Sequence, residues 1–143
     1  MTGGINRYTF ILLFATLLWV YACNSNTIYT DSKPIPSQEW SLDNIPAFSA
    51  DITDTVASNN VFFTIRTGTS YPYSNIYLFV TTTSPSGKSI TDTLQYKLVD
   101  DKGNRYGKGF GDIRELNLYY KNNVYFPVKG IYDIGLRIEK ISK

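Results

Sequence analysis

The sequence predicts an all-β fold, an antiparallel β-sandwich. Aromatic residues make up 15% of the chain, mostly as 12 Tyr and 8 Phe, and charged residues make up only 18%, against about 25% in a typical soluble domain. Short apolar runs recur about every ten residues between Gly, Pro, Asn and Asp, which is the spacing typical of a sandwich or barrel. No segment shows the 3.6-residue period of a helix. We therefore expect a sandwich of the jelly-roll or immunoglobulin-like kind.

The N-terminus has the features of an export signal. Arg7 precedes an apolar run from Tyr8 to Val20, and small Ala22 precedes Cys23. The run is shorter than the about 20 residues that a membrane-spanning helix needs, so we expect it to be cleaved. "VYA" before the single cysteine resembles the lipidation motif of bacterial lipoproteins, which implies acylation of Cys23. The alternative is a soluble secreted protein, cleaved nearby, with a free Cys23 thiol.

These features predict three parts of the chain. A lipoprotein signal peptide covers residues 1–22, a lipid-anchored tether covers 23–39, and a β-sandwich domain covers 40–143. The tether contains the polar and Pro-containing stretch "NSNTIYTDSKPIPSQ", which suits a linker between a bilayer and a domain.

Seven strands are expected from alternation and turn residues. The clearest hairpin joins two arms through "SPSGK", where Pro85 and Gly87 supply turn geometry. Its first arm is apolar on both faces, which predicts a central strand. The expected strands are Phe48–Thr53, Val61–Thr67, Ser74–Thr83, Ser89–Val99, Arg105–Phe110, Leu116–Tyr120 and Tyr132–Ile138.

Alternation also predicts which side chains face the core. In the second hairpin arm these are Ile90, Leu94, Tyr96 and Leu98, and in the last strand they are Tyr132, Ile134, Leu136 and Ile138. Asp92 falls on the inward face. Since a buried carboxylate is costly without donors, we expect Asp92 either near a solvated strand end or bonded to a partner.

The stretch "GKGFGD" could be a phosphate-binding loop or a strand. Gly107, Gly109 and Gly111 follow G-x-G-x-G, which lacks the G-x-x-G spacing and the helix start of a dinucleotide site. With a period of two, all three glycines would lie on one strand face, where another backbone or an aromatic ring could approach closely. The strand is the interpretation that we favour.

Composition narrows the possible chemistry. There is no His, the formal net charge is only +2, and no basic run occurs, which argues against nucleic acid as a partner. No calcium-loop spacing, G-x-S-x-G or Cys–His pair is present. We therefore expect no enzyme activity and no catalytic residue, metal site or cofactor. Several acids could still be searched for a glycosidase pair: Asp51, Asp54, Asp92, Asp100, Asp101, Asp112 and Glu115.

The stretch "TSYPYSNIY" concentrates aromatic rings near one turn. Tyr71, Tyr73 and Tyr77 could present large contact surfaces to a sugar or a protein partner at low entropic cost. Equally, Tyr71 and Tyr73 could hold a loop over the end of the sandwich. Both interpretations remain open from the sequence.

Four segments in this order, behind the lipidation motif, resemble the GldH family of gliding-motility lipoproteins from Bacteroidetes. They are "RTGTSYPYSNIYLFV", "PSGKSITDTLQYKLVDDKGN", "YGKGFGDIRE" and "FPVKG". The resemblance implies a membrane-anchored component required for gliding, with protein partners in the type IX secretion and motility machinery, and it implies no catalytic residues. The runner-up is a lipid-anchored module that binds carbohydrate or peptide through its tyrosines.

Two further expectations follow from this resemblance. No acidic run follows Cys23 of the kind that resembles a surface-export tag, so we expect the domain to face the periplasm. In addition, "FPVKG" runs almost directly into "IYDIGLRIEK", without the further strand and loop of the family pattern. We therefore expect one sheet to have lost a strand and to expose an edge.

Overall fold

The computed structural model describes residues 6–8 and 26–139. The chain divides into two compact units, Met1–Thr30 and Asp31–Lys143, and all the named strands lie in the second. Cys23 and most of the expected export signal lie outside the described residues. Within the described part, no helix is long and apolar enough to cross a membrane.

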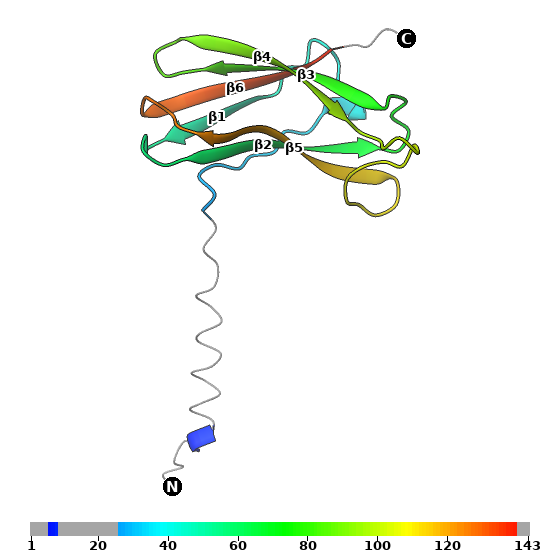
Figure 1. Cartoon of the computed structure of the whole chain (residues 1–143), viewed down its shortest axis with the longest axis horizontal. Helices are drawn as coiled ribbons and strands as arrows, with labels where there is room; N and C mark the ends of the chain where they lie inside the picture. The colour runs from blue at the N-terminus through cyan, green and yellow to red at the C-terminus, as the bar shows by residue number, and fades with distance from the viewer. Residues whose placement is uncertain (1–5, 9–25, 140–143) are drawn as a thin grey trace. The chain divides into compact units, whose positions relative to one another are not determined.

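The second unit contains one short 3-10 helix and two antiparallel sheets. The elements are η2 (Pro36–Gln38), β1 (Ala47–Ile52), β2 (Asn59–Gly68), β3 (Asn75–Thr83), β4 (Ser89–Lys97), β5 (Ile113–Val124) and β6 (Gly130–Ile138). The large sheet has the order β1-β6-β3-β4 and the small sheet consists of β2 and β5 (Figure 1). The predicted all-β class is confirmed. Each strand of the small sheet has a single strand neighbour among the described residues; the expected loss of a family strand stays a prediction.

The strand pairing is nested along the chain. β1 pairs with β6, β2 with β5 and β3 with β4, and β3 also pairs with β6. This is the pattern of one long antiparallel ribbon folded on itself so that its middle and its ends share a sheet. Only the β3–β4 pair is local in sequence.

The core lies between the two sheets. β3 contributes Ile76, Leu78 and Val80, of which the last two are completely buried, and Leu118 of β5 meets them from the small sheet. Phe63 and Ile65 of β2 pack against this cluster but are only partly buried. A second, smaller cluster joins Ala50 and Ile52 of β1 to Tyr132 of β6.

Most of the predicted inward faces agree with the structure. β3 lies inside the large sheet, as its two apolar faces predict, and Tyr132, Ile134, Leu136 and Ile138 are all buried or partly buried. Ile90 is the exception, since it is 55% exposed. It lies beside the β3–β4 turn, opposite Thr82, near the end of the strand and away from the core contacts made by Leu94 and Tyr96.

The predicted strand Arg105–Phe110 is wrong. This segment contains only isolated bridges, Val99 to Arg105 and Lys108 to Glu115. Gly107 and Gly111 have φ of +99° and +63°, in the left-handed region that breaks a strand and favours glycine. The three glycines therefore do not share a strand face.

Two of these glycines nevertheless allow a close backbone approach. A Cβ at Gly107 would lie 2.4 Å from the carbonyl oxygen of Glu115, and one at Gly109 would lie 2.0 Å from that of Ile113. Between them, Lys108 exchanges both backbone hydrogen bonds with Glu115, at 2.9 and 2.7 Å. Residues 107–109 thus lie directly against the start of β5, and side chains at the two glycines would prevent it.

Candidate functional site

The tyrosine loop, residues 69–74 between β2 and β3, carries two of the three predicted partner-binding residues. The rings of Tyr71 and Tyr73 meet edge to face, with centroids 5.4 Å apart, an arrangement that aromatic pairs favour. Tyr71 packs against the core cluster, and its hydroxyl donates to the carbonyl of Asn75 at 3.5 Å. Burial, and then the neighbouring Tyr73, raise the pKa of Tyr71. Tyr71 thus anchors the loop and supports Tyr73.

Arg105 holds the tyrosine loop from the other side. Its Nη2 donates to the carbonyls of Thr69, at 2.9 Å, and Tyr71. Its Nη1 is buried and has no hydrogen-bond partner among the described residues. A guanidinium carries five donors in a rigid fork, so one side chain fixes two points of the loop backbone.

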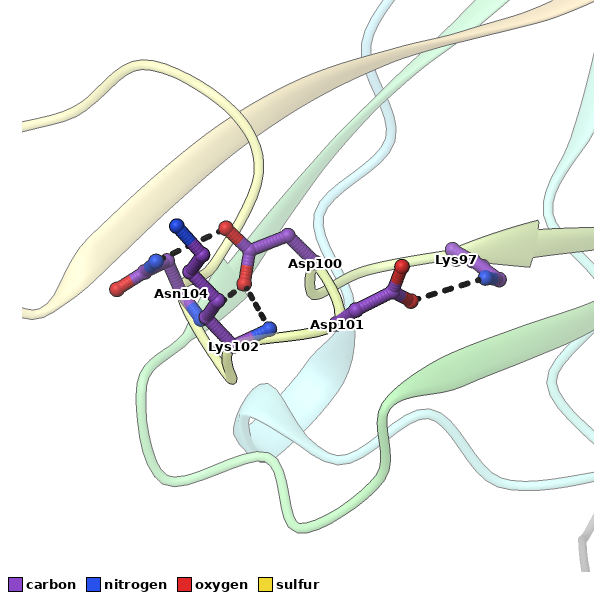
Figure 2. Close-up of polar contacts among 5 residues, drawn as sticks. All are labelled: Lys97, Asp100, Asp101, Lys102 and Asn104. Atoms are coloured by element: carbon purple, nitrogen blue, oxygen red, sulfur yellow. Dashed lines mark hydrogen bonds and ion pairs between the residues drawn. The ribbon is translucent and has the colours of Figure 1, made fainter.

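A tight turn at residues 100–104 determines the position of Arg105. The Asp100 carboxylate accepts hydrogen bonds from the backbone N–H groups of Lys102 and Asn104, at 2.9 and 2.8 Å, and from Asn104 Nδ2 at 2.9 Å (Figure 2). These donors, led by the Asn104 side chain, lower the pKa of Asp100. The turn returns the chain so that Arg105 pairs with Val99. Figure 2 also shows the exposed Lys97–Asp101 pair, at 3.5 Å.

Tyr77 does not belong to the Tyr71–Tyr73 pair. It is on β3, opposite Gln95, and alternates with the inward Ile76 and Leu78, so it faces outward from the large sheet. No ring contact joins it to Tyr71 or Tyr73 among the described residues. The candidate site is therefore the Tyr71–Tyr73 pair with Arg105 behind it, and Tyr77 belongs to another surface.

Asp92 is the centre of a second polar cluster, which links the two sheets. Its Oδ2 accepts from the Tyr120 hydroxyl at 2.6 Å and pairs with Lys121 Nζ at 2.8 Å. The Lys121 bond first, and then the Tyr120 bond, lower the pKa of Asp92, while the pKa of Lys121 is raised. Of the two settings expected for Asp92, a solvated strand end or a bonded partner, the structure shows bonded partners.

A β-bulge makes this double contact possible. Val61 pairs with Lys121 and Phe62 with Tyr119, which leaves Tyr120 as an extra residue in β5. A bulge redirects neighbouring side chains, so that Tyr120 and Lys121, adjacent in sequence, both reach Asp92. The nearby carbonyl of Tyr119 accepts a hydrogen bond from the Tyr96 hydroxyl at 2.7 Å. These contacts connect β4 of the large sheet to β5 of the small sheet.

The remaining sequence candidates do not assemble into a centre within the described residues. There, no group of three or more His, Cys, Asp or Glu could hold a metal ion. Cys23, the predicted lipidation site, lies outside the described residues. Sequence reasoning missed Arg105, because nothing in the local pattern shows which carbonyls an arginine will meet.

The fold and these clusters define an all-β domain whose polar side chains mainly hold loops and sheet edges in place. The family model described as GldH lipoprotein matches residues 27–139, so this chain belongs to the GldH lipoprotein family.

Two relatives extend this match over nearly the whole chain. The chain is 34% identical over 152 aligned positions to gliding motility lipoprotein GldH of Flavobacterium johnsoniae, covering 91% of this chain and 94% of the relative. It is also 34% identical over 128 positions to a gliding motility lipoprotein GldH homolog of Christiangramia forsetii, covering 90% of this chain and 77% of the relative. No solved structure matches the chain at a significant level.

Proposed function

We propose that this chain is a non-enzymatic lipoprotein required for gliding motility, anchored through acylated Cys23 and associated with the type IX secretion and motility machinery. The observation that carries the proposal is the family match from residue 27 to residue 139, supported by two relatives named for gliding motility. Cys23, four residues before the match begins, is positioned to attach this domain to a membrane. Several acyl chains at one site give stable anchoring, since each buried CH₂ contributes roughly 0.8 kcal/mol.

A clean deletion tests this role. We expect the deletion strain to lose spreading on agar and to recover it with the wild-type gene, but not with Cys23→Ala. Incorporation of labelled fatty acid into the wild-type protein, and none into the variant, checks the anchor directly. Normal spreading of the deletion strain would contradict the proposal, and labelling without Cys23 would contradict the anchor.

We further propose that the domain sits in the cell envelope and faces the periplasm, and that its fold is of the jelly-roll rather than the immunoglobulin-like kind. The lack of an acidic run after Cys23 supports the orientation. The nested pairing of β1 with β6, β2 with β5 and β3 with β4 supports the fold, because a jelly roll is a rolled antiparallel ribbon with strands in two sheets. Protease access in intact and permeabilised cells tests the orientation.

The second candidate function is binding of carbohydrate or peptide by the tyrosine loop. The edge-to-face pair of Tyr71 and Tyr73, fixed by Arg105, is the observation that favours it. A glycan array and a partner pull-down with a Tyr71→Ala, Tyr73→Ala variant test it, with Tyr125→Ala, an exposed ring elsewhere, as the control. Loss of glycan binding in the double variant alone supports this candidate, while no glycan binding by the wild type contradicts its carbohydrate form.

A further inference from the structure

The domain has four edge strands, and both edges of the large sheet carry features that oppose pairing with another chain. β4 points Asp92 inward and ends at Lys97. β1 spans only Ala47–Ile52, follows directly after Pro46 and carries the exposed Asp51. Inward charges, prolines and short length are the devices by which edge strands avoid unwanted partners.

The β5 edge of the small sheet is covered by the chain itself. Lys108 bonds the N–H and the carbonyl of Glu115, and the Tyr96 hydroxyl bonds the carbonyl of Tyr119. Since these groups of β5 point away from β2, residues Glu115 and Tyr119 form non-hydrogen-bonded pairs with β2. Backbone alternation in an antiparallel ladder then fixes which groups of β2 face β5 and which face outward.

The free edge of β2 carries the backbone groups of Phe62, Thr64 and Arg66. These residues lie opposite Tyr119, Asn117 and Glu115, respectively, so their N–H and C=O groups point away from β5. Among the described residues, no backbone hydrogen bond reaches this edge. β2 extends over Asn59–Gly68 without a proline. Its one charged side chain, Arg66, is paired with Glu115 of its own sheet at 2.7 Å.

The side chains of β2 are also incompletely covered. Val61, Phe63 and Ile65 face the core but are only partly buried, whereas the inward residues of β3 are buried. On the outer face, Phe62 and Tyr119 form a ring pair, with centroids 6.1 Å apart, and are 52% and 67% exposed. A strand added beside β2 would cover apolar area on both faces.

The β2 sequence is complementary to a second, antiparallel copy of itself. With a two-fold axis at Thr64, Thr64 faces Thr64, Phe62 faces Arg66 and Phe63 faces Ile65 of the other copy. The two Phe62–Arg66 pairs place a guanidinium beside an aromatic ring, which is favourable. This register also keeps like charges apart, whereas an axis at Arg66 would place the two Arg66 side chains opposite each other. A two-fold interface requires this kind of self-complementarity.

We propose that β2 is a homodimer edge, at which two copies of this chain pair antiparallel about Thr64 and join their two-stranded sheets into one four-stranded sheet. Each of Phe62, Thr64 and Arg66 then exchanges backbone hydrogen bonds with the other copy. This pairing is independent of the gliding role and of lipidation.

Disulfide trapping in the full chain tests the register. Hydrogen-bonded antiparallel pairs have Cα atoms about 5.5 Å apart, within the range that a disulfide spans. We expect Thr64→Cys to give a band of twice the monomer mass on non-reducing gels. Asn117→Cys is the matched control, because it removes the same hydrogen bond between Thr64 and Asn117 but lies on β5. The wild type measures the background from Cys23.

A second variant separates assembly from folding. The N–H of Thr64 faces the free edge, and proline is tolerated at edge positions of this kind. We therefore expect Thr64→Pro to keep the β-sheet circular dichroism of the wild type and to sediment as a monomer, while Thr64→Val still sediments as a dimer. A monomeric wild type, Thr64→Cys dimers no more abundant than those of Asn117→Cys, or Thr64→Cys adducts only with another protein would each overturn the proposal.

Discussion

The two sheets differ in how completely the inward side chains of their strands are buried. In β3 every second residue from Ile76 to Val80 is buried, and Leu78 and Val80 are completely inaccessible. In β2 the corresponding inward residues, such as Phe63 and Ile65, remain partly exposed. β3 has a strand on each side, whereas β2 has one neighbour. Burial of a strand is therefore decided by its neighbours as well as by its own pattern.

The largest expected effect contrasts one core residue from each sheet. Leu78→Ala should lower the free energy of unfolding by about 2–5 kcal/mol, since it leaves a cavity in a closed part of the core. Ile65→Ala should cost clearly less, because its site is partly exposed and water already reaches it. Urea denaturation of both variants measures the difference, and an equal loss would show that the small sheet is as well packed as the large one.

The second largest effect is expected from adding a side chain in residues 107–109, which lie against β5. Gly109→Ala would place a Cβ 2.0 Å from the carbonyl oxygen of Ile113, and we expect a loss of about 1–3 kcal/mol, as in other overpacked sites. Gly68→Ala is the control, because its Cβ would meet mainly the Ser70 hydroxyl at 3.3 Å, which can rotate away. Thermal unfolding of the two variants should differ, and similar midpoints would mean that residues 107–109 can move away from β5 at little cost.

The smallest expected effect comes from removing the ion pair that links the two sheets. The pKa of Asp92 is lowered in the folded chain, first by Lys121 and then by Tyr120. A carboxyl with a lowered folded pKa stabilises the fold above its unfolded pKa of about 3.9 and loses this contribution as pH falls through the folded value. Because Asp92 is 38% exposed, Asp92→Asn should cost no more than about 1 kcal/mol at pH 7.

The measurement is the free energy of unfolding of wild type and Asp92→Asn from pH 7 down into the acid range. The two curves should converge at low pH, and a double-mutant cycle with Lys121→Met should assign part of the difference to the pair. A difference that is constant with pH would attribute the effect to something other than the charge of Asp92.

Alternation in the sequence was enough to predict the strands that pack against a well-formed core. It identified the inward faces of β4 and β6, apart from Ile90, and the two apolar faces of β3 predicted its central position, because each of these patterns reflects a buried face. It failed at residues 105–110, where glycines at every second position imitate the spacing of a strand. The positive φ of Gly107 and Gly111 cannot be inferred from residue type, since glycine adopts φ of either sign.

The candidate site was predictable only in part, for a related reason. Tyr71 and Tyr73 are close in sequence, so their contact follows from one turn. Arg105 reaches the same loop from more than thirty positions away, and Asp92 meets Tyr120 and Lys121 through a bulge. Such contacts depend on the path of a loop and on the register of a sheet, which single-residue patterns do not contain.

The nested pairing also sets the order in which the domain can form. Within the described residues β1, the first strand, pairs only with β6, the last one, so a chain that emerges from a pore N-terminus first must wait for residues 130–138 before β1 has a partner. Until then the β3–β4 hairpin can form and, once residues 113–124 have emerged, β2 can pair with β5, although pairings between distant segments are slow to form. We therefore expect an open form in which β1 stays unpaired until the final strand has emerged.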